Sequence, residues 1–278
     1  MRIEPDFFDR FRCKASACRH TCCAGWEIAV DDETLVRYES ELTVSEKRKL
    51  ISSPDGILLC EEGKRCGFLR NDGLCELIIS HGEDILCDIC REHPRFYSYS
   101  ENGGIREAGV GLCCEEAARL WLENDLAFVE ADDEYQPDAD ELRMLEAQKE
   151  LMRKALAGDL PRLDFGELVN VYRKMETLEP LSFSAPDGLD FSDRKARNLA
   201  ARNRAVYYIY RWYLEYPDEV ELFAAANVLM TAALGGDFTD SARKLSCEVE
   251  YDPDNTEMII EYMKKVRTER RAEKTAGR

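Results

Sequence analysis

Apolar residues in the second half of the chain recur at the spacing of long helices. Between residues 141 and 158 they fall near one helical stripe: Leu142, Leu145, Leu151 and Met152. Gly158 follows, where a helix commonly ends because glycine accepts the left-handed conformation of the cap. The same period predicts further helices over 164–179, 193–216 and 218–235, and a charged helix from about residue 254. Asp164 is a candidate cap for the first of these helices.

The first half of the chain shows short mixed segments instead of a long helical period. Trp26–Val30 is expected to be extended, and Asp31 or Asp32 predicts the cap of a helix that starts near Glu33. Between residues 60 and 114, glycine, asparagine and aspartate separate the cysteines, which is typical of a fold built around a metal centre. The segment CEEAARLWLENDLAFV, from residue 114, again predicts a helix.

An acidic stretch, EADDEYQPDADE at 130–141, separates the two halves and predicts a domain boundary. We therefore expect a mostly α protein with two domains. Residues 1–128 would form an irregular, cysteine-rich, metal-binding domain with little strand. Residues 141–278 would form a helical domain.

Composition narrows the class of protein. The 278 residues contain no apolar run near the roughly 18–20 residues that span a bilayer, and the charged N-terminus lacks the apolar core of a secretory signal. We therefore expect a cytoplasmic protein that does not enter a membrane. The net charge of −18 argues against nucleic-acid binding and is compatible with a basic, lysine-bearing partner, although it also simply favours solubility. Oligomeric state cannot be predicted from these features.

The cysteines carry the main chemical information. Of the twelve, eleven lie between residues 13 and 114, and Cys247 stands alone. A reducing cytoplasm opposes structural disulfides, so thiols at this density indicate metal ligands. Thiolates bind both zinc and iron–sulfur clusters, and the spacing does not choose between them.

Four groups of cysteines can be separated along the chain. They are Cys13, Cys18, Cys22 and Cys23; Cys66 and Cys75; Cys87 and Cys90; and Cys113 and Cys114. The two-residue spacer between Cys87 and Cys90 lets both sulfurs reach one ion. Adjacent cysteines rarely ligate the same ion, so each doublet either serves two sites or contains one packing residue. Cys60 and Cys247 are predicted to be structural thiols.

Charged residues beside the thiols suggest a ligand site. Arg91, His93 and Arg95 place positive charge near Cys90, where arginines can hold a carboxylate of a bound cofactor. The alternative is that they neutralise thiolates. His20, between Cys18 and Cys22, is either a ligand or a surface residue.

Four segments of the chain carry a resemblance to a known family, and they occur in this order: CKASACRHTCCAGWEI, RCGFLRNDGLCELIISHGEDILCDICREHPRF, GLCCEEAARL and RNRAVYYIYRWYL. With the later SCEVEYDPDN, they resemble the flagellin lysine N-methylase family, from about Pro5 to about Asp254. The cysteine half also looks like wider zinc- or iron-chelating cysteine-cluster proteins. The resemblance implies metal ligands at Cys13, Cys18, Cys22, Cys23, Cys66, Cys75, Cys87, Cys90 and Cys114.

The resemblance further implies a 4Fe–4S cluster, with zinc as the alternative, and methylation of flagellin lysines from S-adenosylmethionine. Flagellin would then be the partner. The glycines of NGGIREAGVG lack the βαβ frame of a nucleotide-binding Rossmann fold, so an open cluster iron that chelates the donor's amine and carboxylate is our hypothesis for donor binding. The cysteine spacing does not match the radical S-adenosylmethionine motif; a polar transfer is simpler, and both routes stay open.

Aromatic residues are candidates for contact with the methyl donor or the acceptor amine. Trp26, just after the first cysteines, is expected to contact the cofactor, together with Arg91 and Arg95. The tyrosines of AVYYIYRWYL are candidates for cation–π contact, with core packing as the other interpretation: Tyr207, Tyr208, Tyr210 and Tyr213. The alternative function is a non-enzymatic zinc- or iron-binding module for interaction or electron transfer.

Overall fold

The computed structural model describes residues 1–54, 56–131, 134, 136–186, 196–250 and 252–276. The chain divides into two compact units. The helical unit comprises Met1–Phe11 and Tyr97–Arg278, and the cysteine unit comprises Arg12–Phe96. The cysteine unit is thus an insertion in the sequence of the helical unit. These limits differ from the predicted division at 128–141, because the first residues of the chain pair with strands beyond residue 105.

The helical unit contains a four-stranded sheet in the order β5–β6–β1–β7, of which only the first two residues of β5 belong to the cysteine unit. Its strands are β1 Arg2–Pro5, β5 Arg95–Tyr99, β6 Arg106–Val110 and β7 Phe128–Ala131. Strand β1 runs parallel to β6, with Arg2 opposite Arg106, and antiparallel to β7, with Pro5 opposite Phe128. The expectation of little strand is corrected here. Each strand has only four or five residues, which is too short for a clear alternating pattern.

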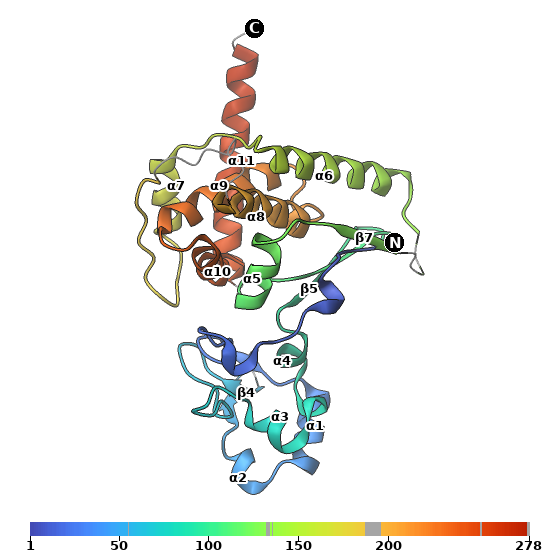
Figure 1. Ribbon diagram of the computed structural model, residues 1–278, viewed down its shortest axis with the longest axis vertical. Helices are drawn as coiled ribbons and strands as arrows, with labels where there is room; N and C mark the ends of the chain where they lie inside the picture. The colour runs from blue at the N-terminus through green and yellow to red at the C-terminus, as the bar shows by residue number, and fades with distance from the viewer. Residues whose placement is uncertain (55, 132–133, 135, 187–195, 251, 277–278) are drawn as a thin grey trace. The chain divides into compact units, whose positions relative to one another are not determined.

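The rest of the helical unit is a set of helices, labelled in Figure 1. They are α5 Glu115–Leu122, α6 Ala139–Ala157, α7 Phe165–Tyr172, α8 Ala196–Trp212, α9 Val220–Leu234, α10 Phe238–Val249 and α11 Pro253–Ala276. Helix α8 packs against α5, α6, α9 and α10. The predicted helical character of this region is confirmed. Helix α10 was not predicted, although Asp237 caps its N-terminus by accepting from the Asp240 amide at 2.9 Å.

Local signals set the ends of several helices as predicted. Gly158 ends α6 in the left-handed conformation, with φ of 80°. Asp164 caps α7 and accepts from the Glu167 amide at 2.8 Å. Residues 132, 133 and 135 of the predicted boundary, and residues 193–195 of the predicted helix before α8, lie outside the described residues.

Buried aromatic side chains join the sheet to the helices. Trp121 of α5 is fully buried and donates from Nε1 to the Val110 carbonyl at 2.8 Å. Its ring packs edge-on against Phe7 and Tyr207. The hydroxyl of Tyr210 lies 2.8 Å from the Ile3 carbonyl oxygen and bonds β1 to α8. The tyrosines of α8 are therefore core residues, as the packing interpretation predicted.

The cysteine unit is built from shorter elements. A small sheet has the order β2–β4–β3, formed by β2 Ile28–Ala29, β3 Ile51–Ser53 and β4 Gly56–Cys60. The helices are α1 Asp32–Glu41, α2 Val44–Lys47, α3 Glu76–His81 and α4 Asp88–Glu92. The predicted cap of α1 is confirmed: Asp31 Oδ1 accepts from the Thr34 amide at 2.9 Å.

Asp31 also holds a second helix. Its Oδ2 accepts from the Asp88 amide, the first residue of α4, at 3.0 Å. These hydrogen bonds, the one to Asp88 foremost, lower the pKa of the Asp31 carboxyl to about 2. One carboxylate therefore caps both α1 and α4 and fixes the start of the segment that carries Cys87 and Cys90.

Within the described part of the chain, no helix combines the length and the apolar character required for crossing a membrane.

Candidate metal centre

Four of the predicted ligands lie around one core of the cysteine unit. Cys87 is fully buried within an apolar cluster that includes Tyr38, Leu59 and Phe68. Three partly buried thiols pack against the same cluster: Cys66, Cys75 and Cys90. These four residues are called the core thiols below. The structure thus brings together the second and third cysteine groups of the sequence.

Short loops and helix starts position the core thiols. Cys75 is the N-cap of α3 and Cys87 is the N-cap of α4, so their sulfurs lie beside backbone amides that have no partner within the helix. The Leu77 and Ile78 amides act to lower the pKa of the Cys75 thiol. The Phe68 amide acts likewise on the Cys66 thiol. Amides aimed at sulfur stabilise the thiolate form, which is the form that binds metals.

Burial opposes these amides and keeps the thiols protonated when no cation is present. It raises the pKa of Cys66 to about 11 and also raises that of Cys75. Cys87 and Cys90 share a hydrogen bond that lowers the pKa of Cys87 and raises that of Cys90. The pair therefore carries one thiolate before the second proton leaves. A soft cation would remove this conflict by replacing the protons.

Tyr38 of α1 was missed by the sequence analysis. Its side chain is 1% exposed, and its hydroxyl has no hydrogen-bond partner among the described residues. Burial raises its pKa first, and each of the four core thiols raises it further when charged. A buried hydroxyl without an acceptor costs free energy. This cost is removed if a group in this core, such as a nearby sulfur atom, accepts a hydrogen bond from Tyr38. The only sequence signal is that Thr34 and Tyr38 share the buried face of α1.

The first cysteine group reaches the same region through Cys23. The Cys66 amide donates to the Cys23 carbonyl at 3.0 Å, and Ala24 pairs with Arg65 in an isolated bridge. A hydrogen bond with Cys22 and the charge of Arg65 help lower the pKa of the Cys23 thiol to about 6. Of the adjacent pair, Cys23 is therefore the better candidate ligand. Cys13 is exposed and Cys18 partly exposed, on either side of the short 3-10 helix Ala15–Ala17.

The predicted charged and aromatic residues have varied surroundings. Arg91 is exposed on α4 and forms ion pairs with Asp88 and Glu92 of its own helix. Burial lowers the pKa of His93 to about 4, so it does not add the positive charge that the sequence suggested. Arg95 begins β5 and is partly buried, as is Trp26 in the loop before β2.

The thiols predicted to be structural are buried or bonded to backbone. Cys60 is fully buried at the end of β4, and its thiol donates to the Glu61 and Lys64 carbonyls, both at 3.4 Å. In the helical unit, the Cys247 thiol donates to the Cys113 carbonyl at 3.8 Å. These arrangements suit protonated thiols.

Cys114, the last predicted ligand, belongs to the helical unit and is the N-cap of α5. The residue before the adjacent doublet is anchored: the Leu112 amide donates to the Tyr207 hydroxyl at 3.2 Å. Tyr207 in turn donates to Glu250 at 2.5 Å, and Glu250 pairs with Arg211 at 3.0 Å. Three of the segments that carry the family resemblance therefore meet at this buried network.

The chemistry of the core thiols suits zinc or an iron–sulfur cluster, since sulfur donors, nearby backbone amides and the Tyr38 hydroxyl surround one small core. The side chains do not converge on a point. Among the described residues, no group of three or more histidine, cysteine, aspartate or glutamate side chains could hold a metal ion as placed. The ligand set therefore stays a prediction.

Comparison with known proteins gives partial matches. The chain is 28% identical over 135 residues to the lysine-N-methylase of Salmonella typhimurium and 27% identical to that of Salmonella choleraesuis. Each match covers 44% of this chain and 33% of the relative, so the matched segment spans about a third of these enzymes. The flagellar biosynthetic protein FliU of Salmonella muenchen is 27% identical, with 78% of its length covered. No protein-family model and no solved structure matches the chain.

Proposed function

We propose that the protein is an S-adenosylmethionine-dependent lysine N-methyltransferase that acts on flagellin and carries a thiolate-bound metal centre. The observation that supports the activity is the similarity to two proteins named lysine-N-methylase. The likeness to a protein named for flagellar biosynthesis supports flagellin as the substrate. The sequence segments that resemble the flagellin lysine N-methylase family occur in both units, so the proposed activity involves both units.

The metal centre is proposed at Cys66, Cys75, Cys87 and Cys90, with Cys23 as the nearest further donor. The grouping of these thiols around one core supports this choice, as do the backbone amides that favour the thiolate forms of Cys66 and Cys75. A 4Fe–4S cluster is the proposed occupant and would supply a redox-active or Lewis-acidic iron when bound. The chain's own part is to bury the centre, to orient its sulfurs with amides and to exclude water from it.

The direct test is mass spectrometry of flagellin after incubation with S-adenosylmethionine and anaerobically purified protein. We expect a gain of whole methyl groups on lysine-containing peptides. The test variant is Cys90→Ser, which removes a proposed ligand, and the matched control is Cys247→Ser. The first should lose both the metal and the methylation, and the second should keep both.

Three results would each remove part of the proposal. Unmodified flagellin with a fully loaded protein would contradict the methylase function and favour a metal-binding module. Colourless protein that holds only zinc would contradict the iron–sulfur cluster. Full metal content in Cys90→Ser would contradict the ligand set.

A further inference from the structure

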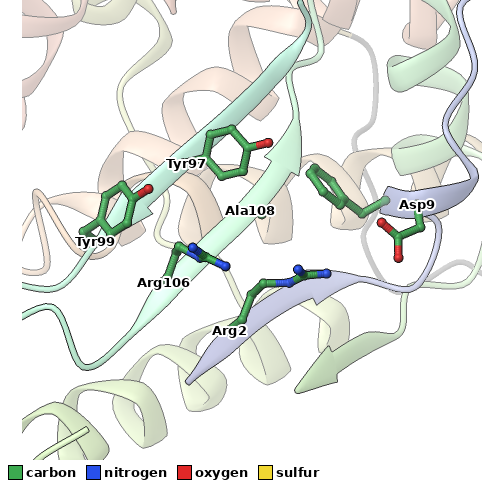
Figure 2. Close-up of a pocket in the computed structure, with 7 residues that line it drawn as sticks. Arg2, Asp9, Tyr97, Tyr99, Arg106 and Ala108 are labelled. Atoms are coloured by element: carbon green, nitrogen blue, oxygen red, sulfur yellow. The ribbon is translucent and has the colours of Figure 1, made fainter. Parts of the chain in front are cut away.

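A cavity of about 350 Å³ opens on the sheet of the helical unit. Its lining residues come from β1, β5, β6 and the short 3-10 helix Phe8–Arg10, and all of them belong to this unit: Arg2, Phe8, Asp9, Tyr97, Tyr99, Arg106 and Ala108. The volume lies within the range of small-molecule sites. Figure 2 shows the arginine, tyrosine and aspartate side chains on the same side of the strands.

Strand alternation explains why these side chains share one face. Arg2 and Arg106 are direct neighbours in the parallel pair β1–β6, so both point to the cavity. The next residues, Ile3 and Glu107, point to the opposite face and are buried. Ala108 forms the floor, where its small side chain leaves room. The cavity is thus fixed by the register of the sheet rather than by a loop.

The charges around the cavity are of both signs. Arg2 forms an ion pair with Glu4 at 2.7 Å, and Glu4 is mostly buried on the same strand. Arg106 neighbours Arg2 in the β1–β6 pair, and Asp9 lines the cavity from the short 3-10 helix (Figure 2). Two arginines and one carboxylate line the cavity, and Glu4 offsets the charge of Arg2 from outside the lining. A ligand with separated positive and negative groups fits such a lining better than a phosphate, which would need a net positive site.

Two tyrosines complete the cavity on the edge strand β5. Tyr97 is 46% exposed and Tyr99 is 60% exposed, whereas the tyrosines of α8 are buried. Tyr97 packs edge-on against Phe8, with ring centroids 6.3 Å apart. Exposed aromatic faces attract cationic or planar ligand groups.

We propose that this cavity binds a zwitterionic α-amino-acid ligand. Its carboxylate is held by Arg106 beside Arg2, its ammonium group faces Asp9, and its remainder lies against Tyr97 and Tyr99. The identity of this ligand rests on the proposed function: it is S-adenosylmethionine, whose sulfonium and adenine groups suit the aromatic faces. The hypothesis of an open cluster iron places the same carboxylate on the metal, so the two binding modes exclude each other.

The test is calorimetric binding of S-adenosylmethionine and S-adenosylhomocysteine to the metal-loaded protein. Arg106→Gln should weaken both by about tenfold to a hundredfold, because a charged hydrogen bond to the carboxylate is lost. Arg143→Gln, which removes an exposed arginine of α6, is the matched control and should bind like wild type. Adenosine lacks the carboxylate, so its affinity should be the same for wild type and Arg106→Gln.

Tyr99→Leu serves as a second variant, because this exposed side chain can change without disturbing the core. We expect it to weaken all three ligands, since the aromatic face contacts the remainder of the ligand. Wild-type affinity in both Arg106→Gln and Tyr99→Leu would overturn the proposal. Methylation of flagellin that persists in such variants would show that the proposed function stands without this site. Arginine-dependent binding without any methylation would leave the site and remove the function.

Discussion

The two units of this chain differ in the interactions that stabilise each of them. The helical unit has helices of up to 24 residues around fully buried aromatic side chains such as Trp121 and Tyr207. The helices of the cysteine unit have between 4 and 10 residues, and thiols form part of its core. Isolated helices shorter than about 12 residues are marginal in water. The helical unit is therefore stabilised by its own packing, whereas on the proposed function the cysteine unit would depend on the metal that its thiols bind.

The largest expected effect follows from removing the metal. A chelator, or the substitution Cys87→Ser, should unfold most of the cysteine unit, because a structural metal supplies folding free energy to a small domain. Amide hydrogen exchange resolves the two units: exchange should accelerate in residues 12–96 and stay slow in α8 and α9. Equal protection of the cysteine unit with and without metal would show that its apolar core suffices.

The next effect concerns the helical unit. Trp121→Ala should lower its free energy of unfolding by about 3–5 kcal/mol, because it leaves a large cavity and removes the bond to the Val110 carbonyl. Urea unfolding measures the loss. Metal content per chain should stay at the wild-type value. If metal is lost as well, the two units do not have the separate stabilities inferred here.

A smaller, pH-dependent effect is expected at Glu107, which is fully buried beneath the sheet. Burial raises the pKa of its carboxyl from 4.5 to about 8, against a lesser opposite effect of Gln148. At pH values between 4.5 and about 8, the folded protein therefore keeps a proton on this carboxyl that the unfolded chain has already lost. Its contribution to stability is full below about pH 4.5, is lost as the pH rises to about 8, and is constant above.

Glu107→Gln removes this dependence, because the amide mimics the protonated carboxyl. The variant should match wild type near pH 5 and exceed it by a few kcal/mol at pH 8, at about 1.4 kcal/mol per pKa unit. Denaturant midpoints measured at both pH values provide the comparison. A constant difference between the two proteins would exclude titration of Glu107 as the cause.

The smallest effect is expected at Tyr38. Tyr38→Phe removes only the buried hydroxyl, which we expect to donate to a sulfur of the metal centre, and should weaken metal binding by about tenfold. Competition with a chelator measures the affinity. Tyr172→Phe is the matched control, because its hydroxyl is equally buried without a partner among the described residues and lies in the helical unit. Equal affinities in the two variants would leave Tyr38 without a role at the metal.

The sequence predicted features that depend on neighbouring residues. The caps at Asp31 and Asp164 and the stop at Gly158 rest on contacts within one helical turn, and all three occur as expected. Strands β1 and β6 were missed because each is short and their pairing joins distant parts of the chain. For the same reason the boundaries of the two units could not be predicted.

The candidate metal site shows the same limit. Cys87 and Cys90 form a pair by spacing alone, and the resemblance added Cys66 and Cys75. Nothing in the sequence places Tyr38 among these thiols, because its position depends on how α1 packs. The cavity beside Arg106 was also missed, since its residues come together only through the sheet.

The position of strand β1 at the start of the chain has a consequence for how the protein folds during its synthesis. Ribosomes deliver its four residues before any of their partners, and β6 and β7 follow only after the whole cysteine unit. The thiols of that unit are therefore synthesised together and, on the proposed function, would collect their metal while the helical unit still lacks a complete sheet. Metal supply during translation, rather than after release, would then determine how much correctly assembled protein a cell obtains.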